Sequence, residues 1–255
     1  MSNAQLVVKL SGHQIDDPDF LSDFAHTIAD LQQPTIIVHG GGKEISALQE
    51  RLGITPQYID GVRITDAESL AIVTMVLCGT INKRLVQALL HVGVDAQGLS
   101  GIDRRLIQAN KMSHPEQDMG FTGEVIAVAG EVLLAMCQQG ITPVIAPISW
   151  GADSHYNVNA DHVAGAVAES VKAERLVFLS NVEGVMVDDV VIPHLSATQT
   201  RALITEGTIF GGMIPKVQTA LQALNAGVES AVITNLDGLR THGGTRFTLL
   251  AEPSV

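Results

Sequence analysis

The chain has 255 residues, of which 46% are hydrophobic, so it can bury one large α/β core or two tightly joined lobes. Its formal net charge of −12 argues against a nucleic-acid-binding protein, because such proteins carry a basic surface, and favours small-molecule partners. The first residues lack a basic region followed by an apolar one, and no run reaches about 18 apolar residues, so we expect a cytoplasmic protein.

The first predicted unit consists of a strand, a helix and a second strand. Leu6 to Lys9 is a short apolar strand that runs into a turn at Ser11-Gly12. Residues 20–31 carry apolar side chains at helical spacing, and Pro34 precedes a second strand that begins at Ile36. This order predicts a βαβ unit with parallel strands.

The second strand ends in Gly40, Gly41 and Gly42, which are followed by Lys43 and an amphipathic helix over residues 44–52. Glycine lacks a Cβ, so its amide group can approach a ligand closely. Such a turn at a helix N-terminus favours a bound anion, although an ordinary tight βα turn is the alternative. The run matches neither the P-loop nor the dinucleotide-binding fingerprint, so any phosphate chemistry must be of another kind.

The next region is predicted as an extended segment followed by two helices. Residues 58–66 form a hairpin-like segment that contains Arg63, and Glu68 is placed to help start the first helix. The helices are expected over residues 67–77 and 82–91. Residues 104–128 follow as a β-rich excursion.

Cys78 and Cys137 each lie within an apolar helical pattern and have no pair spacing. Both are expected to be buried as small hydrophobic residues. Neither indicates a disulfide or a metal site.

The second half continues the alternation of strands and helices. Residues 151–161 are predicted to be a polar loop that contains Asn157 and brings Asp161 close to the start of a helix. Residues 175–180 form a strongly apolar strand, which runs into a turn over residues 181–184. This alternation predicts a mainly parallel sheet covered by helices on both faces, with ligands bound at the carboxyl ends of its strands.

Several short motifs in order resemble the amino-acid kinase family, and within it the branch that phosphorylates N-acetylglutamate. The resemblance covers nearly the whole chain from Leu6 to the Gly-Gly-Thr run that begins at Gly243. The motifs are Lys9-Leu-Ser-Gly12, His39-Gly-Gly-Gly42, Gly61-Val-Arg-Ile-Thr65, Asn157-Val-Asn-Ala-Asp161 and Gly212-Met-Ile-Pro-Lys216.

The resemblance implies an α/β fold, a three-layer αβα sandwich with a mainly parallel central sheet. Residues 1–255 would form a single amino-acid kinase domain. Its N-terminal lobe, about residues 1–170, would bind the acyl amino acid, and its C-terminal lobe, about residues 171–255, would bind ATP.

The implied activity is transfer of the ATP γ-phosphoryl group to the side-chain carboxylate of N-acetyl-L-glutamate, on the route to arginine. Phosphoryl transfer mainly requires alignment and positive charge around the equatorial oxygens. Lys9 and Lys216 match the lysines that supply this charge in the family, and Asp161 matches the aspartate expected to hold both. A solvated surface position is the structural alternative for each lysine, and helix capping is the alternative for Asp161.

Arg63 is expected to bind the α-carboxylate of the substrate, because its planar guanidinium suits bidentate contact. Asn157 and the backbone of Gly41 and Gly42 are the other expected substrate contacts. The alternative for Arg63 is a surface ion pair with Asp66. His39 is expected to be structural, as a neutral imidazole that hydrogen-bonds the turn backbone.

ATP is expected to bind against Asn181, Gly184 and Lys216, with the Gly12 amide cradling the transferred phosphoryl group. Mg²⁺ is expected to be bound largely by phosphate oxygens, without a dedicated protein metal site. The short segment before Leu6 lacks the extra helix of arginine-inhibited hexameric members, so we expect a homodimer without arginine feedback. Its interface is expected in the helix-rich region 67–92.

Two departures from the family pattern leave other functions open. Ser11-Gly12 stands where many acetylglutamate kinases carry two glycines, a form also similar to uridylate kinase. Asn181 replaces a common aspartate, which makes a kinase for N-acetyl- or carrier-linked 2-aminoadipate, in lysine synthesis, the main alternative. A non-catalytic sensor on the same fold is a further alternative, which the presence of Lys9, Lys216 and Asp161 disfavours.

Overall fold

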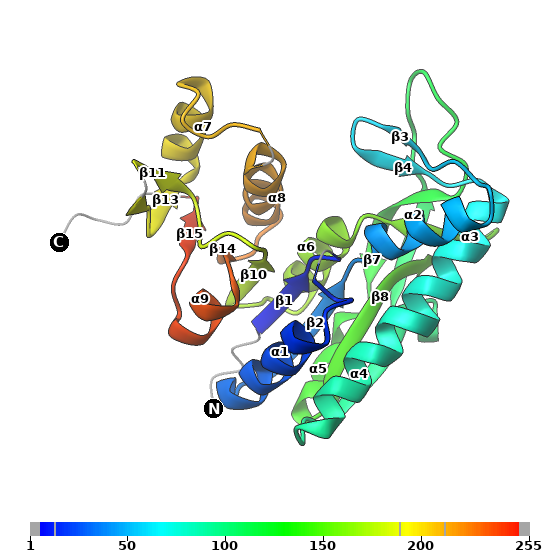
Figure 1. Ribbon diagram of the computed structural model, residues 1–255, viewed down its shortest axis with the longest axis horizontal. Helices are drawn as coiled ribbons and strands as arrows, with labels where there is room; N and C mark the ends of the chain where they lie inside the picture. Colours follow the sequence, from blue (N-terminus) through cyan, green and yellow to red (C-terminus); the bar gives the residue numbers. More distant parts are fainter. Residues whose placement is uncertain (1–5, 13, 189, 212, 250–255) are drawn as a thin grey trace.

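The computed structural model describes residues 6–12, 14–188, 190–211 and 213–249, without the side chain of Pro215. Within these residues a central sheet of 11 strands carries helices on both faces (Figure 1). Ten of its strands follow the order β13-β15-β14-β10-β1-β2-β8-β6-β7-β9, and β5 pairs with β8. The predicted αβα sandwich is therefore confirmed.

The sheet contains strands from both halves of the chain. They are β1 (Leu6–Leu10), β2 (Thr35–His39), β5 (Ala96–Gly101), β6 (Ile107–Lys111), β7 (Thr122–Val128), β8 (Thr142–Trp150), β9 (His155–Val158), β10 (Arg175–Leu179), β13 (His194–Ser196), β14 (Ser230–Thr234) and β15 (Thr245–Thr248). Two hairpins stand apart, β3 (Gln57–Ile59) with β4 (Val62–Ile64) and β11 (Met186–Val187) with β12 (Val190–Val191). The first of them confirms the hairpin predicted around Arg63.

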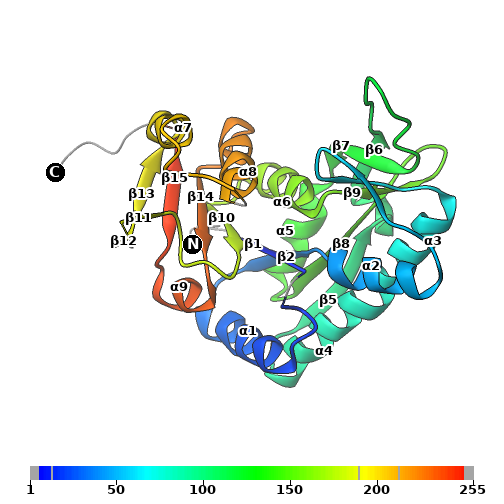
Figure 2. The same ribbon diagram turned by 45° about the horizontal axis from the view of Figure 1, so that its top comes forward.

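The helices alternate with these strands along the chain. They are α1 (Pro18–Leu31), α2 (Gly42–Arg51), α3 (Ala67–Thr74), the π-helical η1 (Met75–Ile81), α4 (Asn82–His91), the short η2 (Asp103–Arg105), α5 (Gly130–Gln138), α6 (Ala160–Ser170), α7 (Ala197–Thr205), α8 (Met213–Asn225) and α9 (Leu236–Thr241). Figure 2 shows α6 and α8 next to each other above the middle of the sheet, and α1 and α4 below it.

The central strands alternate between two hydrophobic cores, because successive strand residues point to opposite faces. Val7 of β1 packs in the core that includes residues of α5, α6 and α8. Its neighbour Val8 packs in the core that includes residues of α1, α4 and α9. The same alternation occurs in β10, where Leu176 and Val177 belong to opposite cores.

The parallel pairing of β1 with both β2 and β10 brings three carboxyl ends to one edge of the sheet. Lys9 lies in register with Val38 of β2 and with Phe178 of β10. Segments that are far apart in sequence, after β1, β2 and β10, therefore begin next to one another. This edge is where a ligand is expected in an open parallel sheet.

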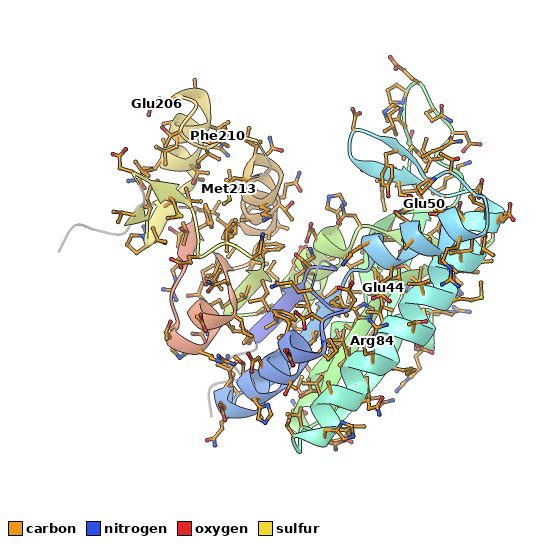
Figure 3. All side chains as sticks on the ribbon, in the orientation of Figure 1. Glu44, Glu50, Arg84, Glu206, Phe210 and Met213 are labelled. Carbon is orange, nitrogen blue, oxygen red and sulfur yellow. The ribbon has the colours of Figure 1, made fainter. Side chains whose placement is uncertain are left out.

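An ion pair fixes α2 beside α4 near this edge. Arg84 donates through Nη1 to Glu44 Oε1 at 2.8 Å and through Nη2 to Glu44 Oε2 at 2.9 Å (Figure 3). Arg84 also donates to the carbonyl of Ile15 at 3.2 Å. Since Glu44 lies in the first turn of α2, these bonds hold the helix start that follows the glycine turn.

Three predicted boundaries need correction. The helices predicted over residues 67–77 and 82–91 are joined through η1 into one continuous helix, because the apolar Met75–Ile81 segment keeps helical geometry. The loop predicted over residues 151–161 contains β9, whose pairing with β7 and β8 outweighs its polar sequence. The sequence also predicts a helix over residues 216–226, and this helix begins earlier, at Met213.

The joined helix, Ala67–His91, is long and apolar enough to cross a membrane by length and composition. Half of its most apolar window is buried inside the protein, however. Residues such as Val73, Leu77 and Leu85 belong to the core beneath it. Core helices pass the same test, so this helix is weak evidence for a membrane span.

Candidate active site

Lys9 and Asp161 form an ion pair at the carboxyl ends of the central strands. Lys9 Nζ lies 2.7 Å from Asp161 Oδ1, and the Lys9 side chain is only 13% exposed. Asp161 lies in the first turn of α6, but its carboxylate does not cap the helix. The cap is Asn159, whose Oδ1 accepts from the Asp161 amide at 2.8 Å. The carboxylate of Asp161 is therefore directed to the lysine.

Lys216 approaches the same place from the other half of the chain. It lies in the first turn of α8, and its Nζ donates to Ser180 Oγ, just beyond β10, at 2.6 Å. Burial and then the charge of Lys9 lower the pKa of Lys216, while Asp161 acts in the opposite direction. The three charged groups therefore lie within electrostatic reach of one another.

One expectation about these groups is met only in part. Asp161 was expected to contact both lysines, but the described contacts give it an ion pair with Lys9 and give Lys216 a hydroxyl partner. The Asp161 carboxylate would contact both ammonium groups only if Lys216 moved closer to it. The hydroxyl of Ser180 is thus the direct support of Lys216.

Ser11 and Ser180 are site residues that the sequence analysis did not single out. Lys9 Nζ donates to Ser11 Oγ at 3.3 Å, and Ser11 Oγ donates to the Leu179 carbonyl at 3.0 Å. Each serine follows directly on a strand that ends at the site, Ser180 immediately after β10. Their position after neighbouring parallel strands is the signal that could have identified them.

The glycine turns after β1 and β2 contact each other through bare backbone. A Cβ added to Gly12 would lie 2.8 Å from the Gly41 nitrogen, a distance that real Cβ atoms essentially never show. A Cβ at Gly41 would meet the side chains of Leu77 and Ile81. Gly42, in contrast, has open space where its Cβ would stand. The requirement for glycine at 12 and 41 therefore comes from close packing.

His39, the last residue of β2, contacts the backbone of the second glycine turn. Its ring is fully buried, with Nδ1 3.0 Å from the Gly40 carbonyl and Nε2 3.2 Å from Asn82 Nδ2. Asn82 also donates to the Val144 carbonyl at 2.9 Å. Burial lowers the pKa of His39 from 6.5 to about 4, so the ring is neutral near pH 7. The hydrogen bond that was expected between the imidazole and the turn backbone is therefore present.

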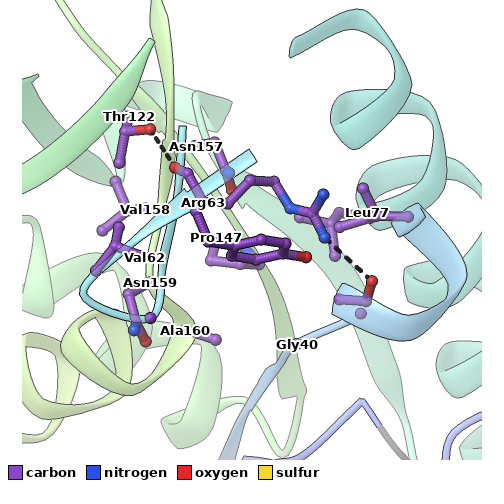
Figure 4. Close-up of a pocket in the computed structure, with 15 residues that line it drawn as sticks. Gly40, Val62, Arg63, Leu77, Thr122, Pro147, Asn157, Val158, Asn159 and Ala160 are labelled. Atoms are coloured by element: carbon purple, nitrogen blue, oxygen red, sulfur yellow. Dashed lines mark hydrogen bonds between the residues drawn. The ribbon is translucent and has the colours of Figure 1, made fainter. Parts of the chain in front are cut away.

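A pocket of about 200 Å³ opens beside these turns (Figure 4). It lies between the start of α2, the β3–β4 hairpin and the β9–α6 connection. The lining residues are Gly40, Gly41, Gly42, Ile45, Tyr58, Gly61, Val62, Arg63, Leu77, Thr122, Pro147, Asn157, Val158, Asn159 and Ala160. The last of these is the chain neighbour of Asp161, so the pocket adjoins the Lys9–Asp161 pair.

Arg63 is a buried cation on the wall of this pocket. Only 8% of the residue is exposed, and Nη2 donates to Ser46 Oγ at 2.8 Å and to the Gly42 carbonyl at 3.3 Å. Its guanidinium carbon lies 4.8 Å from the centre of the Tyr58 ring. Burial lowers the pKa of Arg63, but an arginine stays protonated in proteins.

The alternative of a surface ion pair between Arg63 and Asp66 does not occur among the described contacts. Asp66 Oδ1 instead accepts from the Ser69 amide at 2.7 Å and caps α3. The second terminal nitrogen of Arg63, Nη1, donates to Gln49. A guanidinium has five N–H donors, more than these contacts use.

Asn157, in β9, lines the same pocket, and Figure 4 shows it beside Arg63. Its Nδ2 donates to Thr65 Oγ1 at 3.0 Å, and Thr65 Oγ1 also accepts from Thr122 Oγ1 at 3.1 Å. These bonds fix the Asn157 amide, and among the described residues its oxygen accepts no hydrogen bond. The structure thus brings Arg63, Asn157, Gly41 and Gly42 to one pocket.

The two residues predicted on the nucleotide side differ in their surroundings. Asn181 is exposed and joins the lysine network, since Ser180 Oγ lies 3.3 Å from Asn181 Oδ1. Gly184 is buried, and a Cβ there would lie 2.6 Å from Thr245 Oγ1. Packing against β15 is therefore sufficient reason for a glycine at 184. Gly212, part of the last motif, lies outside the described residues.

Among the described residues, no group of three or more His, Cys, Asp or Glu side chains is placed to hold a metal ion. Asp161 is the carboxylate nearest the two lysines. Mg²⁺ keeps several waters and is commonly bound through one or two carboxylates plus substrate phosphates. The residues present therefore fit a magnesium ion that arrives with a nucleotide.

Comparison with known proteins gives both family and fold matches. The model of the amino acid kinase family matches residues 4–235. An acetylglutamate kinase from Roseiflexus sp. is 49% identical over 243 residues, which are 95% of this chain and 93% of that protein. An acetylglutamate kinase from Chloroflexus aurantiacus is 50% identical over 244 residues, 95% of this chain and 96% of that protein.

A solved structure supports the fold independently of close sequence similarity. Carbamate kinase from Giardia lamblia bound to AMP-PNP superposes with a TM-score of 0.69 at 15% identity. The match covers 97% of this chain and 99% of that one. At this identity the likeness concerns the fold alone.

Proposed function

This chain belongs to the amino acid kinase family, and on that premise we propose that it phosphorylates N-acetyl-L-glutamate with ATP. The product is N-acetylglutamyl 5-phosphate, an acyl phosphate of arginine biosynthesis. The observation that carries the proposal is a small pocket with one buried arginine, Arg63, beside the ion pair of Lys9 and Asp161.

The two lysines are proposed to stabilise the transferred phosphoryl group. Its transition state spreads negative charge over three equatorial oxygens, so catalysis depends on positioning and positive charge. Lys9 comes from β1 and Lys216 from α8, which lets them approach the group from opposite sides. Asp161 orients Lys9 and would draw Lys216 inward when a nucleotide is bound.

The attacking carboxylate needs no general base. A glutamate side chain has an unperturbed pKa of about 4.3 and is ionised near pH 7. The site has instead to keep two anions in line and shield their repulsion. The amides of Gly12 and Gly42 are proposed to donate to the phosphoryl oxygens as they pass.

Arg63 is proposed to bind the α-carboxylate of the substrate, with Asn157 and the backbone of Gly41 and Gly42 completing the pocket. The contacts of Arg63 to Gly42 and Ser46 fix the guanidinium before a ligand arrives. A buried, preoriented arginine suits a planar carboxylate better than a flexible lysine would.

ATP is proposed to bind in the C-terminal lobe, about residues 171–255, with Asn181 and Gly184 near its phosphates. The acyl amino acid would bind in the N-terminal lobe, about residues 1–170. When bound, Mg²⁺ neutralises charge on the phosphate oxygens, and Asp161 is the carboxylate placed to approach its shell. We further propose a cytoplasmic homodimer without arginine feedback.

The experiment that tests this function traps the acyl phosphate with hydroxylamine in the presence of ATP and Mg²⁺. N-acetylglutamate is compared with N-acetylaminoadipate, glutamate and aspartate, and transfer to UMP, which gives no hydroxamate, is followed by the release of ADP. We expect hydroxamate from N-acetylglutamate, lost in Lys216→Ala and retained in Lys172→Ala, which removes an exposed lysine outside the site. A preference for the longer acid would assign the enzyme to lysine synthesis, and absence of transfer to every acceptor would refute the phosphorylation of N-acetylglutamate.

A further inference from the structure

A second cavity, of about 850 Å³, lies at the other end of the central strands. Arg175 is the first residue of β10, whereas the active site begins beyond Leu179, the last residue of that strand. At about 3.3 Å per residue, roughly 13 Å of strand separates the two ends. The cavity is lined by Gln33, Glu174, Arg175, Val191, Pro193, His194, Val232, His242, Gly243, Gly244 and Arg246.

The strand register explains why cations gather there. Val232 of β14 pairs with Arg246 of β15, and Arg246 pairs with His194 of β13, so the three side chains point to the same face. Arg175 is on this face too, because it lies two residues before Val177, and Val177 pairs with Val232 and packs in the same core. Helix α9 ends at Thr241. The residues that follow it, 242–244, line the cavity together with Val232.

The arginines are crowded rather than neutralised. Burial and then the charge of Arg246 lower the pKa of Arg175, and Glu174 is the carboxylate that acts in the opposite direction. Arg175 Nη1 lies 3.4 Å from His242 Nδ1, which is not an anion. No ion pair of Arg246 occurs among the described residues. This arrangement is unusual in a chain whose net charge is −12.

A further donor on the cavity wall lacks a partner. The side-chain nitrogen of Gln33 is buried and has no hydrogen-bond partner within the described part of the chain. A buried donor left unsatisfied costs about 1–3 kcal/mol, so such groups ordinarily meet a ligand, water or ion. An acceptor-rich ligand would satisfy Gln33 and both arginines together.

We propose that this cavity, defined by Gln33, Arg175, His194, His242 and Arg246, binds a small polyanion bearing phosphate or carboxylate groups. Guanidinium groups bind both in the same bidentate way, so the chemistry of the site is shared by the two classes. The cavity volume of about 850 Å³, against about 200 Å³ at Arg63, leaves room for a ligand larger than a single phosphate.

The test is calorimetric titration of the full chain with inorganic diphosphate and, separately, with citrate, in metal-free buffer. We expect Arg175→Gln and Arg246→Gln each to raise the dissociation constant about tenfold, as for loss of one charge-assisted contact. Arg201→Gln removes an exposed arginine of α7 by the same change and should leave the constant unaltered. Arg246 is exposed, so its replacement should not prevent folding.

The active site also attracts anions, so Lys216→Ala is titrated in parallel. Binding whose dissociation constant is unchanged in Lys216→Ala but is raised in the arginine variants belongs to the cavity. Binding of diphosphate alone would identify a phosphate ligand, and binding of citrate alone a carboxylate ligand. Equal constants for the parent and the Arg175→Gln/Arg246→Gln double variant, or no binding of either anion at millimolar concentration, would overturn the proposal. Calorimetry measures binding and not turnover, so the proposal for this cavity is tested separately from the kinase assignment.

Discussion

Ser180 connects the end of β10 to the amine of Lys216 at 2.6 Å. A lysine has four rotatable carbon bonds and is held only where its ammonium finds partners. In this chain the partner is a hydroxyl on the neighbouring strand end, and the carboxylate of Asp161 serves Lys9. Ser180 is therefore a positioning residue for the proposed transfer.

We predict that Ser180→Ala lowers kcat about tenfold, because a hydrogen bond to a charged group contributes about 1.5–3 kcal/mol. The KM for the acyl acceptor should change little, since Ser180 does not line the Arg63 pocket. Initial rates of hydroxamate formation measure both constants. Ser22→Ala, on the exposed face of α1, is the matched control. An unchanged kcat in Ser180→Ala would contradict the positioning role.

Replacement of Arg63 is predicted to change KM for the acyl acceptor, whereas replacement of Ser180 is predicted to change kcat. Replacement by lysine keeps the charge but loses the two-pronged contact to Ser46 and Gly42 and to a ligand carboxylate. We expect Arg63→Lys to raise the KM for N-acetylglutamate about ten- to hundredfold, corresponding to about 1.5–3 kcal/mol. The KM for ATP should be unaffected, as in the control Arg51→Lys. A rise in both KM values would indicate general damage to the fold.

The buried ring of His39 predicts a pH dependence of stability. Its pKa falls from 6.5 to about 4 on folding, so the unfolded chain binds more protons than the folded one between these values. Stability from this group is complete above pH 6.5 and is lost progressively as the pH falls to 4, on the order of 3 kcal/mol.

Urea unfolding of the parent and of His39→Gln, from pH 7.5 to 4, measures this loss. The variant should start less stable at pH 7.5, because the bonds to Gly40 and Asn82 are altered, but should lose less stability on acidification. His26→Gln, an exposed position in α1, should behave like the parent. Identical pH slopes in the parent and His39→Gln would disprove the buried neutral state.

At the residue scale, the sequence predicted the charged groups better than their supports. Lys9, Asp161 and Arg63 belong to short motifs, and the structure pairs Lys9 with Asp161 and places Arg63 on the adjoining pocket. Ser11 and Ser180 escaped prediction because a serine after a strand has no distinctive spacing, and its partner is fixed only when β1 and β10 pair. Their function at the site depends on contacts across most of the chain.

At the scale of elements, one glycine in a turn and one in a helix give a paired test. Gly12→Ala would place a methyl group against the Gly41 nitrogen, so we expect a loss of more than about 2 kcal/mol in stability and at least a tenfold loss of activity. Gly79→Ala lies in η1 with open space and should stabilise the protein by about 0.5–1 kcal/mol. Thermal unfolding and initial rates check both. A harmless Gly12→Ala would show that the turns can separate.

The errors in element prediction share one cause. Strand β9 and the short α9 and β13 carry weak local signals, and they form because neighbouring strands offer hydrogen bonds and apolar surface. Two helices were predicted, over residues 67–77 and 82–91, whereas core packing of Val76, Leu77 and Ile81 keeps the backbone between them helical. Tertiary contacts outweighed local preference in each case.

At the scale of the whole molecule, the layered architecture followed directly from the sequence. Alternating apolar strands and amphipathic helices leave few arrangements besides a covered parallel sheet. The alternation did not predict that β15 runs antiparallel to β14, or that β6 and β7 form an antiparallel pair beside β8. Sequence shows which segments are strands, but the order of strands depends on long-range pairing.

The proposed homodimer gives the last prediction. Met75 and Leu90, on the joined helix Ala67–His91, are 57% and 51% exposed in the single chain. We expect gel filtration to give twice the chain mass and Met75→Glu/Leu90→Glu to give a monomer, because a buried unpaired charge is costly. Phe210→Glu, at an exposed residue of the C-terminal half of the chain, is the control. A hexamer, or inhibition by millimolar arginine, would contradict the proposal.

The backbone contact between Gly12 and Gly41 also sets how far apart the two ligand-facing turns can be. Their separation is defined by main-chain atoms, which every residue shares, and by no side chain that could change rotamer. Substitutions in either core can therefore tilt the surrounding helices while this spacing stays constant. Two glycines that are 29 positions apart in sequence thus fix the distance between the two turns through their backbone atoms alone.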